Sequence, residues 1–344
     1  MGRVSSAVHK VGQVHVGTRF VSYDHYIATR VGIYRNQLPR EGSQSMSYQM
    51  SVEIVDVGPR DGLQNEDSIL SVQERIALIE SLVSVGVGRV EAVSFVNPKR
   101  VPQMADAEGV LAGLSRDVRD RAIGLVLNDR GLQRALAASV PEINFVIVST
   151  DSFARANQGM TTDELIEQWR TIAPIARANG LRTSLTVAAA FGCPFDGPVA
   201  QSHVLEVIEK AFTVPPDELA LADTIGAASP GEVRSLVRSV RSLVPQVVLR
   251  CHFHNTRNAG LANAWVAVEE GVRVLDASVG GIGGCPFAPR ATGNIATEDV
   301  VWMLERSGVS TGVDLERLLE LPPYLEEKLK KPVPSMLSRA GVFP

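Results

Sequence analysis

The sequence has few cysteines, few aromatic residues and no long apolar segment. Its 344 residues include three cysteines, and phenylalanine, tryptophan and tyrosine together make up 5% of them. Three widely spaced cysteines cannot build a disulfide framework, so a reducing compartment is favoured and we expect a cytoplasmic protein. No apolar run approaches the ~20 residues that cross a bilayer, which argues against a membrane protein.

Charge of one sign is not in large excess either. The formal net charge is −4, which gives no electrostatic basis for attraction to nucleic acid or to an anionic membrane surface. The low aromatic content also argues against base stacking. The sequence therefore predicts a protein whose partners include neither nucleic acid nor a membrane.

The first 50 residues differ from the rest. They contain six Lys or Arg residues against two acids, and their apolar residues follow neither strand nor helix periodicity. We expect residues 1–50 to form a disordered extension or to lie upstream of a start at Met46 or Met50, which directly precede the first run. The alternative is an organellar transit peptide, because such leaders are basic and poor in acids.

From residue 52 onward, short β-branched runs alternate with helical stretches. The runs are 52–57, 89–95, 122–128, 143–150, 183–191, 218–224, 247–254 and 272–279. The helical stretches are 72–85, 101–115, 130–139, 162–179, 198–212, 230–243, 258–270 and 296–306. Apolar strands that alternate with helices indicate parallel strands with helices on their outer face.

Eight such units predict a (β/α)8 TIM barrel over residues 51–310, followed by a C-terminal helical tail over 311–344. A doubly wound open sheet is the rival fold. No G-x-G-x-x-G motif follows the first run, so the dinucleotide-binding form of that rival has no support. In a TIM barrel, the residues at the C-terminal ends of the strands form the active face.

The first run is followed by V-G-P-R-D-G-L-Q-N-E, which places Arg60, Asp61 and Gln64 at this face. The same residues also suit a tight turn, so a purely structural role stays open. The seventh run ends in C-H-F-H-N. Because alternate residues of a strand share a face, His252 and His254 should point the same way, into the barrel mouth.

Two imidazoles and the Asp61 carboxylate together predict a metal site. Mixed nitrogen and oxygen ligands suit Mg²⁺, Mn²⁺, Co²⁺ or Zn²⁺ and do not select among them. We therefore expect a divalent metal as cofactor.

A glycine-rich loop follows the eighth run, with Cys285 at its tip and Asn294 and Glu298 after it. Glycines let such a loop approach a ligand closely. A phosphate-binding or merely flexible loop with an incidental thiol remains the alternative. Glu91 and Asp223, on the second and sixth runs, are further candidates, each as a catalyst or as a support for a ligand.

Together these segments resemble the hydroxymethylglutaryl-CoA lyase family. The matching segments, between about residues 52 and 313, are V-G-P-R-D-G-L-Q-N-E, S-F-V-N-P-K-R-V-P-Q-M, F-G-C-P-F-D-G, A-D-T-I-G, H-F-H-N and G-G-C-P-F-A-P-R-A-T-G-N-I-A-T-E-D. The resemblance implies retro-Claisen cleavage of 3-hydroxy-3-methylglutaryl-CoA to acetyl-CoA and acetoacetate, a step of leucine degradation. Related synthases share the Arg-Asp pair and the H-x-H motif, whereas the Cys285 loop is specific to the lyases.

The resemblance also assigns roles. It implies four metal ligands, which are Asp61, His252, His254 and Asn294. Arg60 would hold the thioester oxygen as it becomes an enolate, Glu91 would transfer a proton and hold Arg60, and Cys285 would handle the proton at the acetyl carbon. We add Asp223 as a catalytic candidate and Gln64 as a substrate-binding one. Mg²⁺ or Mn²⁺ is expected before Co²⁺ or Zn²⁺, an acyl-CoA is the expected substrate, and a homo-oligomer, a dimer or larger, is the expected assembly.

The chain departs from the family at two places near the mouth. Where the family usually has Arg-Gly-Tyr, this chain has Ser184-Leu185-Thr186, and where the family has Asp-Thr-Tyr-Gly, it has 255–258, which includes Arg257. Moving positive charge in the mouth changes substrate discrimination. The alternative substrates are citramalyl-CoA or a longer-branched 3-hydroxyglutaryl-CoA, unless nearby Arg182 replaces the missing charge.

Overall fold

Eight parallel strands form a closed barrel in the computed structural model, which describes residues 50–284 and 293–343. The order around the barrel is β1-β10-β9-β8-β5-β4-β3-β2. The strands are β1 (Glu53–Asp56), β2 (Arg89–Ser94), β3 (Ala122–Leu125), β4 (Glu142–Val148), β5 (Arg182–Ala188), β8 (Glu218–Asp223), β9 (Val248–Phe253) and β10 (Val274–Ala277). This arrangement confirms the predicted TIM barrel.

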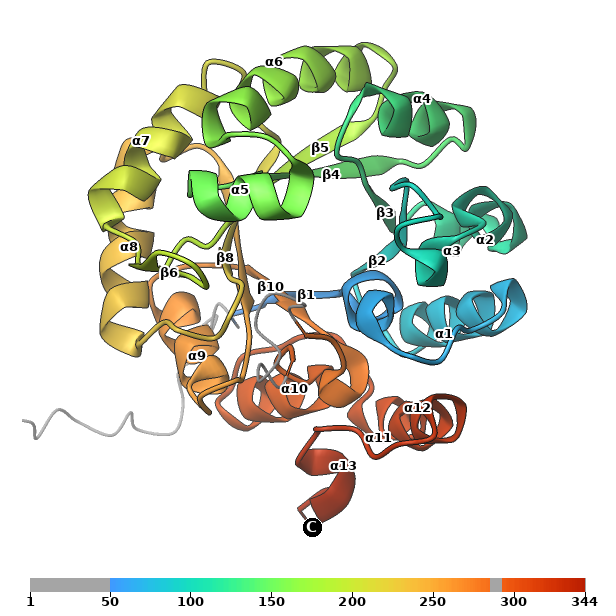
Figure 1. The fold of residues 1–344 in the computed structure, drawn as a ribbon. Coiled ribbons are helices and arrows are strands. Elements are labelled where there is room, and N and C mark those ends of the chain that lie inside the picture. Colours follow the sequence, from blue (N-terminus) through green and yellow to red (C-terminus); the bar gives the residue numbers. More distant parts are fainter. Residues whose placement is uncertain (1–49, 285–292, 344) are drawn as a thin grey trace, which may run out of the picture. The chain divides into compact units, whose positions relative to one another are not determined.

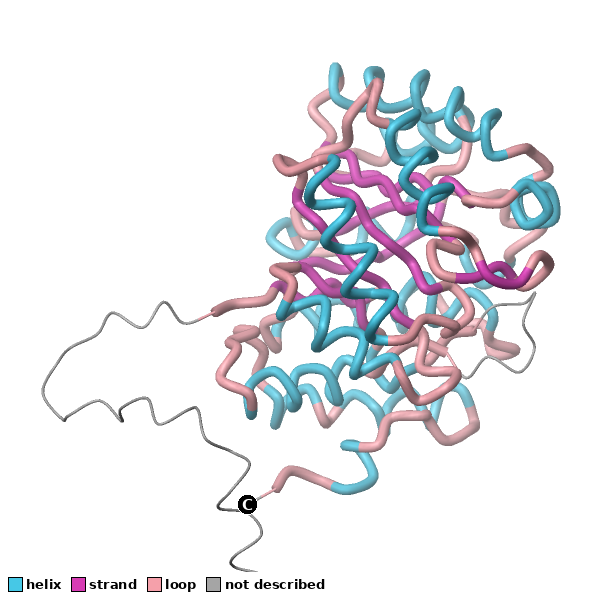
Figure 2. Tube along the Cα trace, turned by 90° about the vertical axis from the view of Figure 1, so that its left-hand side faces the viewer, coloured by secondary structure: helices cyan, strands magenta, loops and turns pink. Residues whose placement is uncertain are grey.

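Helices surround the barrel (Figure 1) and cover the outer faces of its strands (Figure 2). They are α1 (Val72–Ser84), α2 (Ala107–Gly113), α3 (Arg116–Arg119), α4 (Asp129–Ala137), α5 (Asp151–Gln158), α6 (Thr162–Ala178), α7 (Gln201–Ala211), α8 (Pro230–Leu243), α9 (Gly260–Glu269) and α10 (Thr297–Arg306). Three short helices follow, α11 (Leu315–Leu318), α12 (Leu321–Leu329) and α13 (Leu337–Ala340). No helix in the described part of the chain is long and apolar enough to cross a membrane.

Local sequence signals explain where several helices begin. Ser71, Thr161 and Ser229 each accept a hydrogen bond from the backbone of a glutamate three residues later, whose side chain bonds back to the first residue. This reciprocal capping box satisfies backbone N–H groups that the first helical turn leaves unpaired. Helices α6 and α8 begin where their sequence signals predict.

The structure differs from the sequence prediction in three places. The expected single helix over 101–115 is wrong, because a short 3₁₀ turn (Pro102–Met104) and α2 replace it, with Asp106 between them in a left-handed conformation at φ 55°. A left-handed residue cannot continue a right-handed helix. The sequence prediction also missed α5 and a small antiparallel hairpin formed by β6 (Gly192–Cys193) and β7 (Gly197–Pro198).

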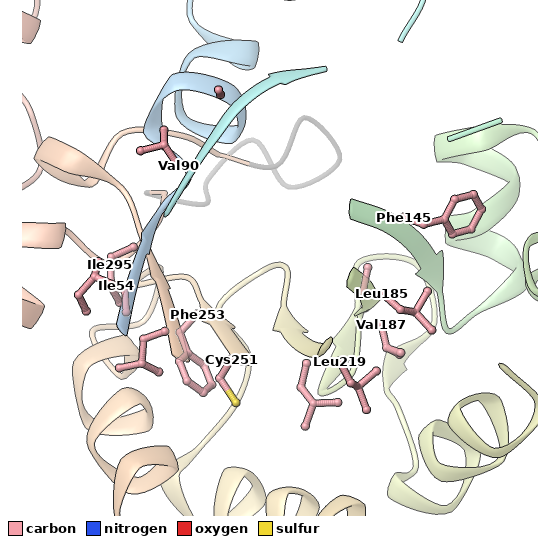
Figure 3. Packing of buried hydrophobic residues seen from close by; sticks show 14 of the residues in the cluster. Ile54, Val90, Phe145, Leu185, Val187, Leu219, Cys251, Phe253 and Ile295 are labelled. Atoms are coloured by element: carbon pink, nitrogen blue, oxygen red, sulfur yellow. The ribbon is translucent and has the colours of Figure 1, made fainter. Parts of the chain in front are cut away.

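Strand alternation separates the core from the barrel interior. On β5, Leu185 and Val187 are buried in the hydrophobic core, whereas Thr186 between them lines the central cavity. Figure 3 shows Phe145 of β4 pointing toward a neighbouring helix, where its ring lies 5.9 Å from that of Trp169 on α6. The core therefore lies between strands and helices, and the inward side chains are free to be polar.

Charged residues cross the lower part of the barrel interior. Arg89 of β2 contacts Glu142 of β4 at 2.9 Å and Glu218 of β8 at 2.7 Å. Since β2 is paired with neither strand, these contacts span the interior. Arg250 of β9 lies 3.1 Å from Glu218 and 3.4 Å from Asp276 of β10, which extends the network upward toward the mouth.

Candidate active site and metal centre

A single π-helical turn, Gly58–Gly62, places Arg60 and Asp61 at the barrel mouth directly after β1. The backbone at Gly58 donates a hydrogen bond to Asp56 Oδ1 at 2.8 Å, and a Cβ added there would meet the same oxygen at 2.8 Å. A Cβ at Gly62 would lie 2.8 Å from Ile282. The glycines are needed for this close packing, and the turn they allow brings Arg60 Nη1 within 2.8 Å of Asp61 Oδ1.

Asp61, His252 and His254 form a cluster that could hold a metal ion. One ligand atom from each residue lies within 4.8 Å of the others. The side chains of His252 and His254 come from alternate positions at the end of β9, and their ring centroids are 5.2 Å apart. His252 and His254 therefore lie on the same face of the strand, as predicted from the sequence.

The amide of Asn294 completes the arrangement. Its Nδ2 donates to Asp61 Oδ2 at 3.0 Å and to the Ile282 carbonyl at 3.1 Å. Its Oδ1, like Nδ1 of His254, is buried and has no hydrogen-bond partner within the described residues. Buried polar atoms are nearly always satisfied, so an unpaired oxygen and nitrogen beside a carboxylate fit a divalent cation well.

The protonation states at the cluster suit metal binding. Burial by itself raises the pKa of Asp61, but Arg60 and the two imidazoles lower it to about 2. Burial and the neighbouring His252 lower the pKa of His254 to about 3. Near neutral pH the carboxylate is therefore charged and the His254 ring neutral, as ligands must be.

Asp276 of β10 supports His252 from behind. His252 Nδ1 lies 3.2 Å from Asp276 Oδ2, and the register pairs the two residues across β9 and β10. Burial lowers the pKa of His252, but the hydrogen bond and charge of Asp276 raise it above its ordinary value. With Nδ1 directed at the carboxylate, Nε2 is left for a metal, the arrangement usual for metal-bound histidines.

Arg60 and Glu91 form a buried ion pair beside the metal cluster. Arg60 Nε donates to Glu91 Oε2 at 2.8 Å, and Nη2 donates to the same oxygen. Burial lowers the pKa of Arg60, but Glu91 and Asp61 more than compensate, so the pKa lies above its ordinary value. The guanidinium is permanently charged and held from two sides, which suits it to stabilise a developing oxyanion.

Two residues that sequence analysis did not select belong to the same site. Asn144 of β4 donates from Nδ2 to Glu91 Oε1 at 3.1 Å, and Thr186 of β5 donates from Oγ1 to Asn144 Oδ1 at 2.9 Å. Both line the central cavity. The available signal for Asn144 was a lone amide within the apolar run I-N-F-V-I-V.

The remaining candidate residues are placed as follows. Both carboxylate oxygens of Asp223 accept backbone N–H groups, from Ala227 at 2.7 Å and Ala228 at 3.1 Å. Gln64 Nε2 donates to Asp61 Oδ1 at 3.2 Å, at the cavity wall. Cys285 lies outside the described residues.

Glu298 lies below the glycine-rich loop and not at the mouth. Its carboxylate accepts the backbone N–H of Gly280 with both oxygens at 3.1 Å. It is fully buried at the start of α10. Its contact therefore holds the first part of the loop in place.

Neither Arg257 nor Arg182, the arginines near the two places where the chain departs from the family, points into the barrel mouth. Arg257 Nη1 donates to the carbonyls of Ile225 at 3.0 Å and Gly226 at 2.7 Å. Arg182 lies at the beginning of β5, 2.9 Å from Glu218, at the opposite end of the barrel. Arg182 therefore does not replace an arginine at position 184.

The mouth leads into a cavity of about 1120 Å³, large enough for an extended ligand. Its wall includes the metal cluster, Arg60, Asn144 and Thr186, and its rim includes Arg100 and Arg130. A divalent cation beside a fixed guanidinium can ease removal of a hydroxyl proton and stabilise an enolate oxygen. That combination is suited to breaking a carbon–carbon bond next to a carbonyl group.

Comparisons with known proteins point the same way. The HMGL-like family model matches residues 40–323. An (R)-citramalyl-CoA lyase of Chloroflexus aurantiacus is 43% identical over 86% of this chain and 96% of its own length, and a mitochondrial hydroxymethylglutaryl-CoA lyase of Rattus norvegicus is 39% identical over 84% and 89%. The solved structure of an HMG-CoA lyase from Acinetobacter baumannii, in complex with coenzyme A and 3-methylmalate, superposes with a TM-score of 0.82 at 37% identity, covering 87% of this chain and 99% of that one.

Proposed function

Because this chain belongs to the HMGL-like family and is a carbon–carbon lyase, we propose that it cleaves 3-hydroxy-3-methylglutaryl-CoA to acetyl-CoA and acetoacetate. The observation that carries the proposal is the Asp61, His252 and His254 cluster next to the Arg60–Glu91 pair. The first group suits a hydroxyl oxygen and the second suits a thioester oxygen. A retro-Claisen cleavage requires both.

The chain's own residues divide the work as follows. A divalent cation held by Asp61, His252, His254 and Asn294 would make the 3-hydroxyl of the substrate more acidic. Glu91 is the proposed acceptor of that proton. As the bond between C2 and C3 breaks, C3 becomes a ketone and the electron pair passes into the thioester enolate.

Arg60 would donate hydrogen bonds to the enolate oxygen, with Glu91 holding the guanidinium in position. A thiol at Cys285 would protonate C2 and so release acetyl-CoA. Gln64 would contact the substrate from the cavity wall. Asp223 would serve as a further catalytic group or as a support for the loop that its carboxylate binds.

A coupled assay of acetyl-CoA release tests the proposal. We expect turnover of 3-hydroxy-3-methylglutaryl-CoA that disappears after treatment with EDTA and returns on addition of Mg²⁺ or Mn²⁺. Full turnover by metal-free protein would contradict the metal site. No cleavage of any 3-hydroxyacyl-CoA by the metal-loaded protein would contradict the proposed reaction.

Citramalyl-CoA is the second candidate substrate. It is favoured by the 43% identity to an (R)-citramalyl-CoA lyase and by the uncharged Ser184 where the resembling family has an arginine. The two substrates share the thioester and the 3-hydroxyl, so one catalytic set serves both. The ratio of their kcat/KM values decides between them.

Further details complete the proposal. Mixed imidazole, amide and carboxylate ligands support Mg²⁺ or Mn²⁺, with Co²⁺ or Zn²⁺ as alternatives. The buried free thiols of Cys193 and Cys251 suit the cytoplasm, and acetoacetate formation suits leucine degradation. A homo-oligomer, a dimer or larger, stays a prediction for light scattering to test.

A further inference from the structure

A chain of hydrogen bonds connects β5 to the catalytic arginine. Thr186 donates to Asn144 at 2.9 Å, Asn144 donates to Glu91 Oε1 at 3.1 Å, and Arg60 donates to Glu91 Oε2 at 2.8 Å. Arg60 then reaches Asp61 of the metal cluster at 2.8 Å. The chain thus links three strands to the turn after β1 and ends at a candidate metal ligand.

The direction of these bonds follows from the chemistry of the groups. A carboxylate paired with a guanidinium can only accept, so Asn144 must turn its NH₂ group toward Glu91 and its carbonyl oxygen toward Thr186. That oxygen requires a donor, which the Thr186 hydroxyl supplies. The more distant Ser184 hydroxyl, at 3.4 Å, adds a weaker contact.

The proton of Thr186 is therefore already used. Toward the cavity, this residue offers only an acceptor oxygen and a methyl group, and neither can bind a carboxylate. Its neighbours in the cavity wall, Val146, Ala188 and Ala222, are apolar and no larger than valine. The wall formed by β4, β5 and β8 at this height, which we call the β4–β5 wall, is thus uncharged and lined by small side chains.

We propose that Asn144 and Thr186 have two roles, one in positioning the catalytic pair and one in substrate specificity. This inference rests on the proposed lyase function. Asn144 is a positioning residue that holds the Arg60–Glu91 pair, with Thr186 fixing its orientation. Thr186 is also a specificity-determining residue, because the β4–β5 wall receives the uncharged branch at C3 of the substrate. The carboxylate of the substrate then lies away from this wall.

Three substitutions at Thr186 separate the two roles. Thr186→Val keeps the shape and removes the hydroxyl, Thr186→Ser keeps the hydroxyl, and Thr186→Tyr fills the space in front of the wall. Thr183→Val is the matched control, because Thr183 lies on the same strand and its hydroxyl bonds to Asp217 at 2.8 Å, outside the cavity. Each variant is assayed with CoA thioesters of 3-hydroxyglutarate that carry hydrogen, methyl or ethyl at C3.

For positioning, we expect Thr186→Val to lower kcat roughly 3- to 10-fold, the scale of one lost hydrogen bond, with little change in KM. Thr186→Ser, which retains the hydroxyl, should recover most of the kcat lost in Thr186→Val, and Thr183→Val should keep the wild-type kcat. For specificity, Thr186→Tyr should lower kcat/KM for the ethyl substrate at least about 10-fold more than for the hydrogen substrate. Thr186→Leu replaces the tyrosine variant if the latter does not fold.

The outcomes are distinguishable from failure of the proposed function. Wild-type protein that cleaves none of the thioesters would overturn the lyase proposal and this inference with it. If the wild-type protein is active, three results would overturn this inference and leave the lyase proposal intact. The first is full kcat in Thr186→Val, and the second is a loss of kcat in Thr183→Val as large as that in Thr186→Val. The third is an unchanged order of substrate preference in Thr186→Tyr or Thr186→Leu.

Discussion

Two buried atoms at the candidate metal centre, Nδ1 of His254 and Oδ1 of Asn294, have no partner within the described residues. An unsatisfied buried polar atom costs about 1–3 kcal/mol. Both atoms lie in a cluster whose carboxylate is ionised and whose His254 ring is neutral near pH 7. A divalent cation would satisfy them, which explains why the sequence keeps polar groups here despite their cost.

Asp276 should tune the affinity of this centre through His252. Removing its charge in Asp276→Asn weakens the support for the His252 ring, so metal affinity should fall about 10- to 100-fold. Isothermal titration with Mn²⁺ measures this directly, and the visible spectrum of the Co²⁺ form should change as well. Glu142→Gln is a suitable control. Glu142 and Asp276 are each 4% exposed and each contacts an arginine, but only Asp276 also contacts His252. An equal loss in the control would indicate a general structural effect.

Cys285 should matter for turnover more than for folding. On the proposed mechanism, Cys285→Ser removes the group that protonates the acetyl carbon, and acid–base catalysis of this kind is worth roughly 10²-fold or more. We expect kcat to fall by that amount with an unchanged melting temperature. A wild-type rate in Cys285→Ser would mean that the thiol is incidental.

The elements that meet below the glycine-rich loop hold its beginning in place. The N–H groups of Val279 and Gly280 are bound by Asp56 of β1 at 2.9 Å and by Glu298 of α10 at 3.1 Å. The Gly280 carbonyl accepts from the backbone of Ser335 at 3.1 Å. Gly280 has φ 70°, a conformation that favours glycine, so three separate segments converge on a turn that other residues would strain.

This clamp should make stability depend on pH. Burial raises the pKa of Glu298 to about 7, and the charge of nearby Asp299 adds to this rise. Hydrogen bonds from Ser335 and from the Gly280 backbone lower the pKa and so offset only part of it. Between pH 4.5 and 7 the folded state keeps a proton that the unfolded state has released. Stability from this group is therefore lost as pH rises through that window and levels off above pH 7.

Urea unfolding at several pH values between 5 and 8 tests this expectation. The glutamine in Glu298→Gln cannot ionise, so the free energy of unfolding of this variant should fall less with rising pH than that of the wild type. Across the window, the two decreases should differ by on the order of 2–3 kcal/mol. Glu316→Gln, at an exposed carboxyl, should follow the wild-type curve. Parallel curves for Glu298→Gln and the wild type would contradict the assigned role.

At the scale of the whole barrel, an ion network replaces much of the apolar filling that such interiors usually have. Strands β1, β2, β4, β5, β8, β9 and β10 each contribute at least one charged side chain. Arg89 and Glu218 each have three partners in this network, and those of Arg89 are Glu53, Glu142 and Glu218. Removal of one partner leaves buried charges uncompensated, so a substitution in this network should lower the free energy of unfolding of the barrel.

Arg89→Ala should destabilise the barrel by about 3–5 kcal/mol, because Glu142 and Glu218 would each lose a buried guanidinium partner. The free energy of unfolding in urea measures the effect. Arg116→Ala, which removes an arginine whose side chain is 86% exposed and 3.9 Å from Asp120, should change it little. A similarly small effect of Arg89→Ala would mean that the network contributes little to stability.

The fold and the outline of the site could be predicted from the sequence because they depend on local periodicity. Eight apolar runs alternating with helical stretches suffice to predict the closed barrel. Alternation along a strand also predicts that His252 and His254 share a face. The loop order of a barrel then predicts Arg60 and Asp61 beside them.

Contacts between strands distant in sequence were decided only by the tertiary structure. Thr186, Asn144 and Glu91 are separated by 42 and 53 positions, and no periodicity indicates that their side chains meet. The same is true of Asp276 behind His252 and of Arg257, which turned out to bind a neighbouring loop. Local sequence determines which way a side chain points along its own strand, but barrel closure and register determine which side chain it meets.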